Sequence, residues 1–130
     1  MTPTWMLFPA AVLYLLSLGF PVFQFENHSP VMGLQVLLWG WWGFLGFNFG
    51  WLANGFALVG AACLLQDKPK SALYFTAAAA LLAFEGFAVK EWWFNEGSGT
   101  LVKSLGAGFY LWFSAMLLTF LAAGWASLRR

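Results

Sequence analysis

The chain has 130 residues, of which 62% are hydrophobic and only 8% charged, with a formal net charge of +1. A soluble domain needs about a quarter of its residues charged to keep its surface hydrated, so this composition excludes an ordinary soluble domain. It predicts one integral membrane domain covering residues 1–130, whose first partner is the lipid bilayer.

Four apolar segments have the length of membrane crossings. The hydrocarbon core of a bilayer is about 30 Å thick and needs about 20 apolar residues per helix. Residues 5–23, 49–65, 72–89 and 105–128 approach or meet that length. We therefore expect an all-α membrane protein, built as a compact bundle of four transmembrane helices. Residues 5–23 lack the basic start and the cleavage site of a signal peptide, so we expect a retained helix.

The second apolar stretch, residues 32–65, is the most unusual part of the chain. As one straight helix it would run to about 50 Å, too long for one upright crossing. It is also too short for two crossings and a turn. Trp39, Trp41 and Trp42 suit a membrane–water boundary. We expect an interfacial or re-entrant half-helix at about residues 32–45 and an interruption between Gly43 and Asn54. The alternative is one continuous, steeply tilted helix.

Glycines in the same stretch recur at helical spacing. They would form one helix face, and small residues on a face let two backbones approach closely in lipid. The predicted helix-packing face consists of Gly40, Gly43, Gly46 and Gly50.

A few polar side chains fall inside or beside the apolar segments. Asn48 and Asn54 need hydrogen-bond partners at membrane depth, and the favoured interpretation is that they cap the broken backbone or tie the second helix to its neighbours. The alternative is a polar pocket at the interruption. Glu85 lies about one turn from the end of the third segment. We favour a structural or interfacial role for Glu85 over an ion or proton site.

Connections and charge predict the topology. Residues 66–70 form a short turn, so the second and third crossings should pack as an antiparallel hairpin. Four of the six basic residues would lie on one face of a four-crossing protein: Lys68, Lys70, Arg129 and Arg130. By the positive-inside rule, both termini and this turn should be cytoplasmic.

No set of residues in the sequence defines a reaction. His28 is the only histidine and Cys63 the only cysteine, so one chain offers no multi-histidine metal site and no disulfide. Glu26 and His28 fall in a polar loop of the opposite face, where solvated side chains are usual. We expect no enzyme activity, no cofactor, no metal and no nucleic-acid partner.

One sequence pattern consists of the run Gly40-Trp41-Trp42-Gly43 followed by Asn-Phe-Gly-Trp-Leu-Ala-Asn at residues 48–54. It resembles a group of small bacterial inner-membrane proteins that share a G-W-x-G … N-F-x-W-x-A-N pattern. Gly55 stands where the group would have proline. The resemblance implies a bacterial inner-membrane location and implies no activity.

The leading functional expectation is an aromatic-rich inner-membrane protein that acts through helix–helix contacts. It would be an accessory subunit of a membrane complex or an immunity-type protein that blocks a membrane-targeted toxin. The alternative is a homo-oligomeric channel or small-solute transporter, with Asn48, Asn54 and Glu85 lining the path.

Overall fold

A computed structural model describes residues 4–26, 29–39, 50–89, 91–92 and 100–128, and gives only the backbone of residues 91, 92 and 100. The described part is mostly helical. Its α-helices are α1 (Leu7–Ser17), α2 (Gly33–Trp39), α3 (Ala53–Leu65), α4 (Pro69–Ala83) and α5 (Ala107–Leu128). Three 3-10 turns in the described part adjoin them: η1 (Thr4–Met6) precedes α1, η3 (Gly50–Leu52) precedes α3, and η4 (Phe84–Ala88) follows α4.

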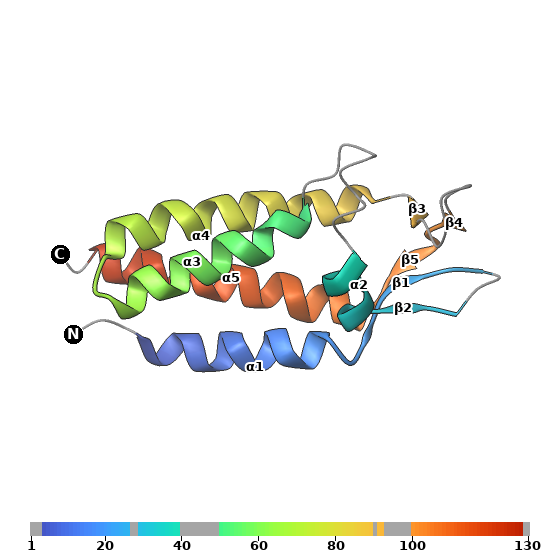
Figure 1. Ribbon diagram of the computed structural model, residues 1–130, viewed down its shortest axis with the longest axis horizontal. Helices are drawn as coiled ribbons and strands as arrows, with labels where there is room; N and C mark the ends of the chain where they lie inside the picture. Colours follow the sequence, from blue (N-terminus) through green and yellow to red (C-terminus); the bar gives the residue numbers. More distant parts are fainter. Residues whose placement is uncertain (1–3, 27–28, 40–49, 90, 93–99, 129–130) are drawn as a thin grey trace.

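Helices α1, α3, α4 and α5 lie side by side along the long axis of the molecule (Figure 1). Helix α3 packs on α4, α4 packs on α5, and α5 packs on α1, so α5 is the central helix. The turn between α3 and α4 is tight: the Lys68 N–H donates to the Cys63 carbonyl at 2.9 Å, and Asp67 takes a left-handed φ of 61°. The helical hairpin expected from residues 66–70 is confirmed.

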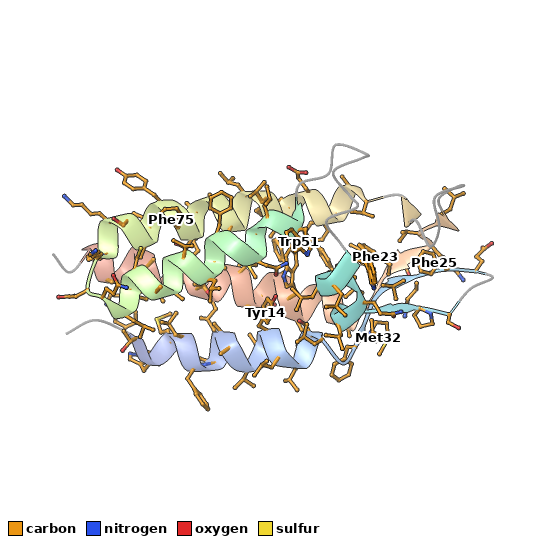
Figure 2. All side chains as sticks on the ribbon, in the orientation of Figure 1. Tyr14, Phe23, Phe25, Met32, Trp51 and Phe75 are labelled. Carbon is orange, nitrogen blue, oxygen red and sulfur yellow. The ribbon has the colours of Figure 1, made fainter. Side chains whose placement is uncertain are left out.

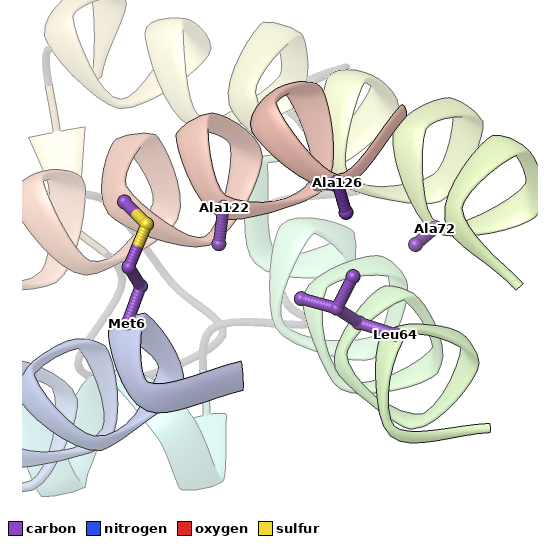
Figure 3. Packing of buried hydrophobic residues seen from close by; sticks show 6 residues of the cluster. Met6, Leu64, Ala72, Ala122 and Ala126 are labelled. Carbon is purple, nitrogen blue, oxygen red and sulfur yellow. The ribbon is translucent and has the colours of Figure 1, made fainter. Parts of the chain in front are cut away.

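Small residues fill the space between these helices. Ten of the eighteen buried hydrophobic residues in the described part are alanines. They are Ala10, Ala53, Ala72, Ala79, Ala80, Ala83, Ala115, Ala122, Ala123 and Ala126. Figure 3 shows one such cluster, in which Met6 and Leu64 fill the gaps beside Ala72, Ala122 and Ala126. Small side chains let the helix axes approach closely, which favours extensive backbone-to-backbone packing.

Large apolar side chains lie on the outside instead. Each of the long helices exposes several of them, among them Phe8 and Leu15 on α1, Leu58 on α3, Tyr74 and Leu81 on α4, and Leu121 and Trp125 on α5. Phe8 is 76% exposed and Leu58 73%. A soluble protein buries such residues and exposes polar ones. This protein has the opposite arrangement, with small residues between the helices and large apolar residues on the outside.

Two of the four expected segments reach membrane-spanning length as helices. Pro69–Ala88 has 20 residues and Ala107–Leu128 has 22, and both are apolar enough to cross a membrane. The apolar helices Thr4–Ser17 and Gly50–Leu65 are shorter, at about 21 and 24 Å by the usual rise per residue. The sequence predicted a first helix that extends to residue 23, but the helix ends at Ser17.

The expectation of an all-α protein is wrong at one end of the bundle. Three short strands pair there as an antiparallel sheet in the order β2–β1–β5: β1 (Pro21–Gln24), β2 (Val31–Met32) and β5 (Ser104–Leu105). A separate pair, β3 (Glu91–Trp92) and β4 (Thr100–Leu101), lies at the same end (Figure 1). Pro21 favours the change at β1, because proline disfavours helix in the residue before it and Val22 and Phe23 after it are β-branched and aromatic.

We call the β2–β1–β5 sheet the cap. Its inner side continues the core of the bundle, since Phe23, Phe25 and Val31 are buried with Phe109 of α5. The cap is closely joined to the helices: the Gly33 N–H donates to the Phe20 carbonyl at 3.0 Å, and a Cβ at Gly33 would overlap the Ser17 carbonyl. Only glycine fits at this crossing of two backbone segments.

The second apolar stretch is not one straight helix. The Trp51 indole N–H donates to the Leu37 carbonyl at 2.9 Å, although the two residues are 14 positions apart. In a continuous helix, that separation would place their backbones about 21 Å apart. This contact shows that the stretch is interrupted and excludes the steeply tilted single helix. The expected position of the interruption, between Gly43 and Asn54, stays a prediction. Residues 40–49, which connect α2 to η3, lie outside the described residues.

Candidate functional site

A polar network among the described side chains centres on Asn54, near the start of α3. Its side-chain oxygen accepts two hydrogen bonds, from the Tyr14 hydroxyl at 2.9 Å and from the Trp112 indole N–H at 2.8 Å. Its side-chain nitrogen donates to the Trp51 carbonyl at 3.0 Å. One amide therefore joins α1, α3 and α5. We call Tyr14, Trp51, Asn54 and Trp112 the Asn54 hub.

Each helix presents its hub residue for a local reason. Ala53 is fully buried, so the start of α3 approaches α4 and α5 closely enough for a short side chain to reach across. Tyrosine and tryptophan combine a large apolar body with one polar tip, which suits an amide surrounded by apolar residues. Figure 2 shows Tyr14 reaching from α1 into the space between α1 and the other helices.

The hub also holds the short helix α2. The carbonyls in the last turn of a helix have no partner within that helix, and Leu37 lies in the last turn of α2. Trp51 supplies the missing donor through its indole N–H. Trp51 therefore contributes a carbonyl to Asn54 and an N–H to Leu37, and so connects α2 to the bundle.

The hydrogen bonds of the Asn54 hub link helices to one another. An amide oxygen has two lone pairs, and in Asn54 both face donors from Tyr14 and Trp112. In the described part of the chain, every buried side-chain nitrogen or oxygen has a hydrogen-bond partner. The same part contains no group of three or more histidine, cysteine, aspartate or glutamate residues placed to hold a metal ion.

The other predicted site residues are dispersed. Glu85 is half-buried in η4, which packs against η3, and it takes part in an interaction within the protein. Glu26 is exposed just after β1, and Gly50 is buried in η3. The remaining predicted residues lie outside the described residues: His28, Gly40, Gly43, Gly46 and Asn48.

Sequence reasoning singled out Asn54 but not the residues that bind it. Tyr14 and Trp112 lie 40 and 58 positions away, so no local spacing could connect them to Asn54. The available signal was a polar tip in the middle of an apolar segment, since Tyr14 lies inside residues 5–23. A buried polar tip must find a partner, although the sequence does not identify which one.

Comparisons of this chain with protein-family models, with curated proteins and with solved structures found no match.

Proposed function

We propose that the protein is a polytopic membrane protein that crosses the bilayer four times and acts through lateral helix–helix contacts. The observation that carries this proposal is the reversed packing, with alanines buried between helices and large apolar side chains exposed along them. In water such a surface would aggregate, whereas in lipid it costs nothing. The two long helices have the length and apolar composition of membrane crossings.

The two shorter helices complete their crossings with the segments that adjoin them. Helix α1 is followed by β1, and α3 is preceded by η3 and the segment that includes α2. Open sheet edges do not occur in the hydrocarbon region, so the strands belong at its border, where water and headgroups reach the backbone groups of the edge strands. The cap would then lie at the level of the lipid headgroups or beyond.

Helix α2 is proposed to lie along the membrane interface, as the interfacial half-helix expected from residues 32–45. It exposes Leu34, Leu38 and Trp39 and is joined to the bundle through Leu37. An exposed tryptophan beside leucines is typical of the boundary between hydrocarbon and headgroups.

The role of the protein is proposed to be that of an accessory subunit of an inner-membrane complex, or of an immunity-type protein. Gly55 on α3 and Gly124 on α5 support lateral contacts, because a Cβ at either position would meet no atom within 4 Å. Their open surfaces allow a neighbouring helix to approach closely. A homo-oligomeric channel would need Asn54 to face a solute path, but Tyr14 and Trp112 occupy its oxygen.

The experiment is purification of the tagged chain in mild detergent, followed by size measurement and identification of co-purified membrane proteins. Gly55→Leu and Gly124→Leu are expected to reduce association by blocking helix approach. Leu81→Ile changes an exposed position of α4 conservatively and serves as the matched control. A monodisperse monomer without any partner, both in wild type and in these variants, would contradict the proposal.

A further inference from the structure

The charged residues separate toward the two ends of the bundle. One end holds the α3–α4 turn with Asp67, Lys68 and Lys70, and α5 ends there, followed in sequence by Arg129 and Arg130. Among the described residues, this end holds two lysines and one aspartate. The described residues toward the other end include three acidic residues and one basic residue: Glu26, Glu85 and Glu91 with Lys103. We call the first end the basic end.

The backbone of the basic end is held in one conformation. The Lys68 N–H donates to the Cys63 carbonyl at 2.9 Å, and the Ala72 N–H donates to the Lys68 carbonyl at 3.0 Å. Below the turn, Leu64 and Ala72 are buried together with Ala126 of α5. The turn is therefore fixed beside the last turn of α5, and both lysine side chains are exposed.

Exposed apolar and aromatic side chains surround the helices just below the lysines. Leu65 is 68% exposed and Tyr74 is 76% exposed. Trp5 and Trp125 meet edge to face, with ring centroids 6.3 Å apart, and both are exposed. Aromatic rings of this kind lie at the headgroup boundary, and lysine stems extend past them into the headgroups. The ammonium groups of Lys68 and Lys70 would then stand at the level of the lipid phosphates.

We propose that the basic end binds the headgroups of anionic phospholipids. Lys68 and Lys70 supply the cations that contact the phosphate groups, and the rings of Trp5, Tyr74 and Trp125 hold the helix ends at the depth where those phosphates lie. The inference rests on the membrane location in the proposed function. A lipid is the fitting source of the phosphate, because the apolar surface continues directly from the lysines down the helices.

The test uses the full-length protein reconstituted in phosphatidylcholine vesicles that contain either spin-labelled phosphatidylglycerol or spin-labelled phosphatidylcholine. The fraction of each label immobilised by the protein gives its relative association constant. We expect phosphatidylglycerol to be preferred, and Lys68→Gln with Lys70→Gln to reduce that preference by about fivefold per lysine at low salt. Added salt should weaken the preference in the wild type, since exposed charges are screened.

Two control variants keep the test specific. Lys103→Gln removes an exposed lysine at the cap and should leave the preference unchanged. Lys68→Arg with Lys70→Arg keeps both charges and should retain it. Equal immobilisation of the two labels by the wild type, or an equal loss in Lys103→Gln, would overturn the inference. A protein that does not incorporate into vesicles at all would instead contradict the proposed membrane location.

Discussion

The side-chain oxygen of Asn54 on α3 accepts a hydrogen bond of 2.8 Å from the indole of Trp112 on α5, and the two residues are 58 positions apart in the sequence. Tyr14 donates to the same oxygen from a third helix. Where the surroundings are apolar, a donor that loses its acceptor has no water to replace it. The three helices are therefore coupled through one side chain.

Asn54→Leu is expected to lower the free energy of unfolding by about 1–3 kcal/mol, because it leaves the Tyr14 hydroxyl and the Trp112 indole without an acceptor. Tyr14→Phe removes one donor and leaves the acceptor paired, so its loss should be smaller, about 0.6 kcal/mol. The measurement is reversible unfolding in mixed detergent micelles. Gly55→Ala, at the adjacent position with open space around it, is the control. Equal stability of Asn54→Leu and Gly55→Ala would show that the hub contributes nothing.

The contact between α3 and α4 depends on Gly60. A Cβ at this position would lie 2.5 Å from Cγ2 of Thr76 and 3.2 Å from the Thr76 backbone nitrogen. Gly60→Ala should therefore destabilise the hairpin by about 1–3 kcal/mol through overpacking. Thr76→Ser removes the Cγ2 methyl and keeps the hydroxyl that donates to the Ala72 carbonyl at 2.7 Å. The double variant should recover part of the loss, and strictly additive effects would contradict the assigned contact.

The close approach of the start of α2 to the end of α1 depends on Gly33. Gly33→Ala would push a methyl group into the Ser17 carbonyl, where two backbone segments meet and neither can move alone. We expect a severe loss of folded protein, measured as yield and thermal stability in detergent. Gly124→Ala is the matched control in an open helical position, and it should be neutral or stabilising by up to about 1 kcal/mol. Normal stability of Gly33→Ala would mean that the backbones are farther apart than described.

The attachment of α2 through Trp51 predicts a local effect. Trp51→Phe keeps an aromatic ring but removes the N–H that Leu37 accepts, so α2 should open more often while α4 and α5 remain folded. Hydrogen exchange followed by mass spectrometry should show faster exchange in residues 33–39 and unchanged exchange in residues 69–83. Faster exchange throughout the chain would indicate general destabilisation instead.

The sequence predicted the helical segments because apolar length is a local property. Residues 107–128 form α5 within two positions of the expected start, and the turn at residues 66–70 was correctly placed. The interruption of residues 32–65 followed from length alone. The strands were missed because Val31–Met32 and Ser104–Leu105 are two residues each and pair with a strand far away in sequence. Such pairing is decided by tertiary packing, which local propensity does not report.

The candidate site was predictable only in part for a related reason. A buried asparagine must be satisfied, so Asn54 could be singled out from the sequence. Its partners Tyr14 and Trp112 depend on the packing order of the helices, in which α5 lies between α1 and α4. That order follows from the positions of alanines on several helices together.

The central claim is that the basic end and the cap lie on opposite sides of a membrane. The direct measurement is cysteine accessibility in intact cells, in a Cys63→Ser background, with single cysteines at Gln66 in the α3–α4 turn and at Ser98 between β3 and β4. These substitutions leave all six basic residues in place, so the charge bias that sets the orientation is unchanged. We predict that an impermeant maleimide labels Ser98→Cys from outside and Gln66→Cys only after the membrane is permeabilised. Labelling of both positions from the same side, before permeabilisation, would contradict the account.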